Sequence, residues 1–246
     1  MKRKRGTGRR PKAYKRRRTY ARKKVRRAKR AMGLSAKATL SGFPQSRICR
    51  LRYGEYLTMT PSLGFSTQFL NFAANGLFDP NLQVGGHQPL GFDQWTTFYN
   101  HYTVLGSKIT VKFILNNALQ ATNYTPIACG VKLLDDATAV YSTGAFFDNL
   151  AERGFSYKIM VPNVNQVYPV RCVSKYSAKK FFNLKDVKDN NTRVGSPATG
   201  NPNELAVYQI YFGSLNGQGV SDYTMQCLVT IDYIVQWSEP KDLAQS

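Results

Sequence analysis

Residues 224–237 read TMQCLVTIDYIVQW and are the clearest indication of the fold in this chain of 246 residues. Every odd position from Met225 to Trp237 is apolar, whereas the even positions hold mostly Thr, Gln and Asp. Successive side chains of a β-strand point to opposite faces of a sheet. This period of two therefore predicts a strand with one buried and one outward face.

Similar alternation recurs along the rest of the chain. Odd positions from Cys49 to Met59 are mainly apolar, and Ile109–Leu115 alternates with Lys108 and Lys112 on the opposite face. Weaker candidate strands cover 64–73, 125–134, 154–161, 168–176 and 204–214. Eight strands separated by turn-forming residues predict an all-β fold, an eight-stranded jelly-roll sandwich, with an open barrel as the alternative.

Two stretches interrupt the predicted strands. Asp93 is placed to cap a helix. The apolar face of this helix would hold Trp95, Phe98, Tyr99 and Tyr102. Residues 177–203 are rich in Ser, Lys, Asn, Gly and Pro, which predicts a long loop. Both tryptophans, Trp95 and Trp237, are expected to be largely buried because large aromatic side chains stabilise a core most.

The net charge of +21 lies almost entirely at the N-terminus. Residues 1–30 hold 18 of the 35 Lys and Arg residues and no acidic residue. The other 17 basic residues and all 14 acidic residues lie in 31–246, whose net charge is therefore +3. A tail of this composition repels itself and cannot bury a core. We expect a disordered basic arm with its linker over residues 1–40 and the jelly-roll domain over 41–246.

The arm predicts a nucleic-acid partner, since each Lys or Arg that pairs with a phosphate releases condensed counterions. The predicted phosphate-binding residues are Lys2, Arg3, Lys4, Arg5, Arg9, Arg10, Lys12, Lys15, Arg16, Arg17, Arg18, Arg22, Lys23, Lys24, Arg26, Arg27, Lys29 and Arg30. Tyr14 and Tyr20 lie between basic clusters and can stack on unpaired bases, although they can equally be spacers. The clusters KRKR (2–5), KRRR (15–18) and RKKVRRAKR (22–30) also fit nuclear import signals.

Catalytic and metal-binding patterns are missing from the sequence. The chain has only His87 and His101 and no HExxH, GxSxG, Walker or GxGxxG pattern. Its four cysteines form no C-x-x-C pair and indicate reduced thiols. An enzyme acting on nucleic acid would need clustered acids or histidines for metal ions, and none cluster. We predict a protein without enzymatic activity, cofactor or metal, and without membrane insertion, since no long apolar stretch occurs.

Residues 87–113, HQPLGFDQWTTFYNHYTVLGSKITVKF, resemble the capsid proteins of circoviruses and related circular single-stranded DNA viruses. The shared pattern is a Gly-aromatic-Asp start, an aromatic-rich helical turn with Tyr-x-x-Tyr, and a Lys-bearing strand. The Arg-rich N-terminus, the chain length, the segment YSAKKFF (176–182) and the closing strand also agree, so the resemblance covers most of the chain. Geminivirus coat proteins also have a basic N-terminus, but their central motifs find no match here.

The resemblance implies a coat protein with a jelly-roll fold that assembles with itself into a shell of about sixty copies. It implies that the arm packages a single-stranded DNA genome and that host import receptors carry the protein to the nucleus. The expected locations are the virion and the host cell nucleus. The alternative is a cellular basic nucleic-acid-binding protein of the ribosomal or chromatin type. The near-neutral body argues against it, because ribosomal proteins usually spread their charge over the folded part.

The resemblance also implies that strands 47–59, 104–116, 168–176 and 223–237 form one sheet. The alternation then places six basic side chains on the outer face of this sheet, namely Arg50, Arg52, Lys108, Lys112, Arg171 and Lys175. We predict these residues as secondary nucleic-acid contacts, with solvated charges or subunit contacts as the equal alternative.

Overall fold

The computed structural model describes residues 43–59, 67–83, 86–116, 126–135, 151–160, 169–187, 194–215 and 224–242. The chain divides into two units, Met1–Gln45 and Ser46–Ser246. Nearly all of the first unit lies outside the described residues. The fold below is that of the second unit.

The described residues of this unit form nine strands and two short helices. The strands are β1 (Ser46–Met59), β2 (Thr67–Ala73), β3 (Tyr99–Asn116), β4 (Ile127–Leu134), β5 (Tyr157–Met160), β6 (Val170–Ser177), β7 (Gly195–Pro197), β8 (Val207–Ser214) and β9 (Thr224–Pro240). The helices are α2 (Phe92–Thr96) and α4 (Ala178–Phe181). All eight predicted strands are present.

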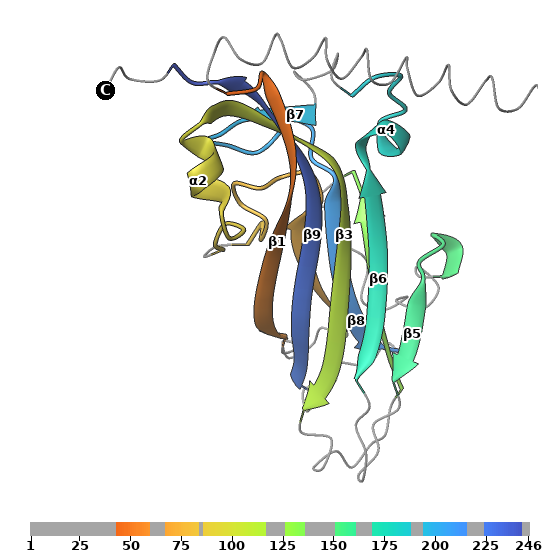
Figure 1. Cartoon of the computed structure of the whole chain (residues 1–246). Helices are drawn as coiled ribbons and strands as arrows, with labels where there is room; N and C mark the ends of the chain where they lie inside the picture. Colours follow the sequence, from red (N-terminus) through yellow and green to blue (C-terminus); the bar gives the residue numbers. More distant parts are fainter. Residues whose placement is uncertain are drawn as a thin grey trace, which may run out of the picture. The chain divides into compact units, whose positions relative to one another are not determined.

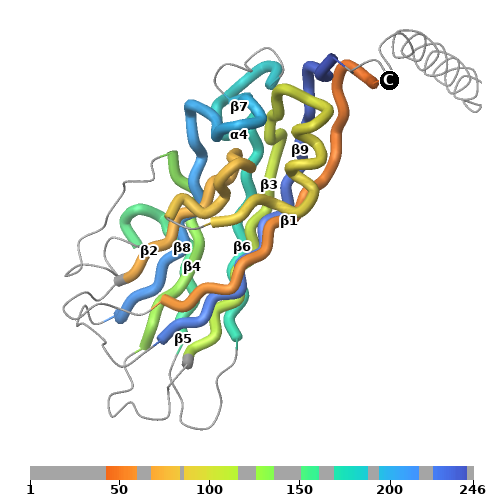
Figure 2. Tube along the Cα trace, turned by 90° about the vertical axis from the view of Figure 1, so that its left-hand side faces the viewer, coloured from red at the N-terminus to blue at the C-terminus, as the bar shows by residue number. Residues whose placement is uncertain are grey.

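The strands build two antiparallel sheets, which Figure 2 shows as two layers. The first sheet has the order β1-β9-β3-β6, with β7 also paired to β3, and the second has the order β2-β8-β4-β5. The pairs β1–β9, β2–β8, β3–β6 and β4–β5 are nested along the chain and alternate between the two sheets. This is the path of a long hairpin rolled into a jelly roll. The predicted jelly roll is confirmed, and the open-barrel alternative is wrong because the two sheets stay separate.

The core lies between the two sheets and confirms the strand phase predicted for residues 224–237. All seven odd-numbered side chains from Met225 to Trp237 are at most 2% exposed. Buried hydroxyl groups connect the layers: Tyr233 Oη donates to the carbonyl of Ala73 at 2.8 Å, and Ser107 Oγ donates to that of Ala74 at 2.6 Å. The polar ends of these core side chains are thus satisfied, as burial requires.

The helix predicted from Asp93 is much shorter than expected. Gly91, with φ 87°, is its N-cap, and the helix ends at Thr96. Tyr99 and Tyr102 belong to β3, and there they lie opposite Pro240 and Trp237 of β9. The hydroxyl groups of Thr96 and Thr97 donate to the carbonyls of Asp93 and Gln94, at 2.7 and 2.6 Å. Such bonds compete with helix propagation, and pairing with β9 then favours the extended chain.

One further prediction was wrong in part. The stretch 177–203 was expected to be a loop, but it contains α4 and β7. β7 is only three residues long, too short to show a periodic pattern, and is defined by its pairing with His101–Thr103 of β3. Trp95 is partly buried against the core and Trp237 is fully buried, which agrees with the prediction that both are largely buried.

The described part of the chain contains no helix that is both long and apolar enough to cross a membrane. All four cysteines are free thiols, and Cys129, Cys172 and Cys227 are buried. Over the same described residues, no group of three or more His, Cys, Asp or Glu side chains is placed to hold a metal ion.

Candidate nucleic-acid interface

The 18 predicted phosphate-binding residues of the arm, together with Tyr14 and Tyr20, lie outside the described residues. Of the predicted site residues, the structure therefore shows the positions of only the six basic residues in the body. The predicted sheet is confirmed: β1, β9, β3 and β6 lie side by side in that order (Figure 1). Five of the six basic side chains are exposed on its outer face, and that of Lys108 is half-buried there.

The register of the sheet sorts these side chains into rows that run across the strands. Lys108 lies opposite Lys175 on one side and opposite Asp232 on the other, and Asp232 in turn lies opposite Arg52. A second row on the same face joins Lys112, Arg171, Leu228 and Tyr56. Like charges placed directly opposite each other destabilise a pair of antiparallel strands. The pairs Lys108–Lys175 and Lys112–Arg171 therefore lower the stability of the sheet, and an anionic partner would remove this cost.

Asp232 is the single acidic residue in these two rows. Arg52 Nε donates to Asp232 Oδ1 at 2.6 Å, and the two side chains are 71% and 45% exposed. This hydrogen bond raises the pKa of Arg52. So exposed an ion pair adds little to stability. The six predicted cations and Asp232 together carry a formal charge of +5.

Apolar side chains lie between the charged ones on the same face. Their exposed fractions are 57% for Ile48, 56% for Tyr56, 44% for Val173, 38% for Leu228 and 40% for Ile234. A surface that mixes exposed apolar groups with cations suits a partner that has both apolar and anionic parts. Single-stranded nucleic acid has both, in its bases and its phosphates.

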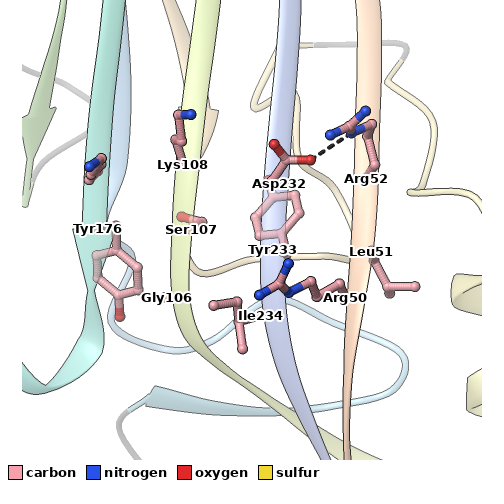
Figure 3. A pocket seen from close by; sticks show the side chains of 11 residues that line it. Arg50, Leu51, Arg52, Gly106, Ser107, Lys108, Tyr176, Asp232, Tyr233 and Ile234 are labelled. Carbon is pink, nitrogen blue, oxygen red and sulfur yellow. Dashed lines mark hydrogen bonds and ion pairs between the residues drawn. The ribbon is translucent and has the colours of Figure 1, made fainter.

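A hollow of about 510 Å³ lies in this face, and Figure 3 shows its lining. The charged groups around it are Arg50, Arg52, Lys108, Lys175 and Asp232, and the side chain of Ile234 contributes an apolar wall. The hollow lies where the register between β3 and β9 shifts, between Val104 and Gly106. A Cβ atom at Gly106 would lie 3.1 Å from the carbonyl oxygen of Tyr176, so glycine allows β3 and β6 to approach closely here.

Among the residues of this hollow that sequence reasoning missed are Gly106, Asp232 and Ile234. The alternation in 224–237 already placed Asp232 and Ile234 at outward positions. The alternation did not show the strand register that places Asp232 opposite Lys108 and Ile234 opposite Gly106.

A separate group of polar side chains holds the loop after β2 against β1. Tyr53 Oη donates to a carboxylate oxygen of Glu55. Asn81 Nδ2 donates to the Oε1 and Oε2 atoms of Glu55, at 3.2 and 3.1 Å. Burial, and then the nearby charge of Glu55, raise the pKa of Asp79 in this loop. His87 stacks on Tyr53 with ring centroids 4.6 Å apart, which gives this histidine a structural role.

No protein-family model matches the chain, and no curated protein matches it either. Similar solved structures include that of Desmodium yellow mottle tymovirus, with 14% identity over 81% of this chain and 93% of that one and a TM-score of 0.37. They also include the 60-mer BFDV capsid protein, with 14% identity, coverage of 82% and 97%, and a TM-score of 0.40. The Mud crab tombus-like virus structure has 13% identity, coverage of 80% and 84%, and a TM-score of 0.40. Similarity at this level concerns the fold alone, so the function is inferred below from the residues of this chain.

Proposed function

We propose that this chain is the capsid protein of a small virus, resembling those of circoviruses, and that it has no enzymatic activity. It assembles into an icosahedral shell through residues 41–246 and packages circular single-stranded DNA through the basic arm of residues 1–40. The observation that carries this proposal is the separation of charge. Eighteen cations and no acid occupy the first thirty residues, whereas the remainder, with a net charge of +3, forms a jelly roll, a fold found in viral capsid domains.

The two parts have complementary physical roles. A nearly neutral body can pack against copies of itself without strong repulsion, whereas a high net charge would oppose assembly. The arm binds phosphates without reading bases. The six predicted cations on the outer face of the first sheet, with a formal charge of +5 when Asp232 is included, give the packaged strand a second contact surface.

The charge of the arm also suits the amount of cargo. About sixty arms line a closed shell of the smallest icosahedral type. They carry on the order of a thousand positive charges against one phosphate charge per nucleotide, so a strand of roughly one to two thousand nucleotides is balanced within a factor of two. Duplex DNA of the same length would double the charge and would resist bending, with a persistence length of about 50 nm.

The three basic clusters of the arm support a role in nuclear import. The resembled viruses replicate in the nucleus, so the coat protein must reach it to meet the genome. We therefore include host import receptors among its partners and place the protein in the virion and in the host cell nucleus.

The experiment replaces nine of the 18 arm cations by Gln and measures the length of the nucleic acid extracted from purified particles. We expect shorter nucleic acid or empty shells, with an unchanged circular dichroism spectrum. The matched control exchanges Lys and Arg at the same nine positions, which keeps the charge and should keep the length. Unchanged length in the Gln variant would show that a packaging signal, rather than charge balance, selects the cargo. A wild-type chain that elutes as a small species without particles would favour the cellular alternative.

A further inference from the structure

The hollow at Gly106 differs from the rest of the basic face because three chemical features converge on it. Lys108 and Lys175 lie opposite each other at its edge, Ile234 is 40% exposed beside them, and the backbone of Gly106, which carries no side chain, lines it. Arg50 extends from β1 across β9 toward Ile234 (Figure 3). The volume of the hollow, about 510 Å³, lies within the range of about 300–1,000 Å³ that is usual for small-molecule sites.

We propose that this hollow is a nucleotide-binding pocket of the body, which holds one unpaired base against Ile234 and the backbone of Gly106. The phosphates on either side of that base contact Lys108, Lys175 and Arg50. This inference rests on the proposed function, because it takes single-stranded nucleic acid as the cargo. It adds a site in the folded body to the binding by the arm, and it gives the body a preference for unpaired bases.

The carboxylate of Asp232 explains why a nucleotide fits this pocket better than a free phosphate does. Asp232 lies in the row between Lys108 and Arg52, so a phosphate placed centrally would meet a negative charge. Arg52 is already paired with this carboxylate at 2.6 Å. A neutral base with N–H donors can lie next to Asp232, whereas its phosphates reach the cations at the edge. A paired base is held inside its stack and cannot enter such a pocket.

The second row of the same face provides a matched control. Lys112 and Arg171 are a cross-strand cationic pair on the same two strands, and Leu228 next to them is 38% exposed, close to the 40% of Ile234. None of these three residues lines the hollow. Removing either cationic pair takes two charges from one face, so the general electrostatic attraction falls equally. Only the pair at the hollow also belongs to the proposed pocket.

The test uses the full-length protein bound to an oligothymidylate that carries photoreactive 4-thiothymidine, with cross-linked peptides identified by mass spectrometry. In the wild type we expect cross-links to the arm and to the strand segments around Lys108 and Ile234. In Lys108→Gln/Lys175→Gln and in Ile234→Thr, the ratio of pocket to arm cross-links should fall about fivefold or more, the lower end of what one well-seated base contributes. In Lys112→Gln/Arg171→Gln and in Leu228→Thr, this ratio should stay unchanged while total binding weakens in the charge variant.

Competition on the wild-type protein tests the same site without any substitution. Thymidine monophosphate should suppress the cross-links near Lys108 and Ile234, and inorganic phosphate at the same concentration should not. Equal ratios in both double variants, or equal competition by phosphate, would overturn the pocket. Particles that contain nucleic acid but lack these cross-links would refute the pocket alone, whereas a chain that forms no particles would refute the proposed function.

Discussion

Trp237 lies at the centre of the aromatic cluster that joins α2, β3 and β9, and replacing it by Ala is the sharpest test of the fold. Its side chain is fully buried, and Nε1 donates to Cys49 Sγ at 3.2 Å. The Trp95 ring is nearly parallel to that of Trp237, at an angle of 12° and a centroid distance of 5.9 Å. The other rings around it, at 5.8 to 6.5 Å, are Phe92, Tyr99 and Tyr102.

The size of the effect follows from this burial. A tryptophan that removes about 200 Å² from water, at about 25 cal/mol per Å², contributes about 5 kcal/mol. Measured losses for Trp→Ala in cores are about 3–5 kcal/mol, because the cavity relaxes only in part. In a domain of roughly 150–250 residues, each kcal/mol lowers the melting temperature by about 2–4 °C. We therefore expect Trp237→Ala to melt about 6–20 °C below the wild type.

The assay is thermal unfolding followed by circular dichroism, at one protein concentration and one scan rate, since large assemblies often unfold irreversibly. Trp95→Ala is the matched control. The Trp95 ring is only partly buried, so its removal should lower the melting temperature clearly less than the removal of Trp237. A Trp237→Ala protein that melts within a degree of the wild type would show that the strand phase of residues 224–237 is wrong. A larger loss in Trp95→Ala would refute the assignment of Trp237 as the centre of the cluster.

Three further predictions concern the arm and one carboxylate. Deleting residues 1–33 removes all 18 arm cations and none of the buried core, so most nucleic-acid binding should disappear while the circular dichroism spectrum persists; unchanged affinity in filter binding at physiological salt would contradict this. Residues 1–30, fused to a fluorescent protein too large to diffuse through nuclear pores, should accumulate in nuclei, and exclusively cytoplasmic fluorescence would count against import. Burial and the charge of Glu55 raise the pKa of Asp79, so its ionised form destabilises the folded state at pH 7. Asp79→Asn should thus raise the melting temperature at pH 7, and the gain should vanish below the ordinary pKa of 3.8, where Asp79 is itself protonated; a gain independent of pH would refute this cause.

The eight main strands were predictable because their signal is local. The alternation in Met225–Trp237 reports which side chains are buried, whatever the neighbouring strand is. The helix from Asp93 was predicted too long for the same reason. The spacing of Trp95, Tyr99 and Tyr102 suits a helix, but pairing of Tyr99 and Tyr102 with β9 decides the backbone conformation.

The amino-acid sequence by itself determined the all-β class, the inward face of the closing strand and the separation of charge between arm and body, since each is a property of consecutive residues. Only the tertiary structure decided that Arg52, Asp232, Lys108 and Lys175 form one row, because they come from four strands whose register depends on long-range pairing. The hollow beside Gly106 has the same origin. It depends on a register shift between β3 and β9 and on the close approach of β6, which arise only when distant segments of the chain are brought together.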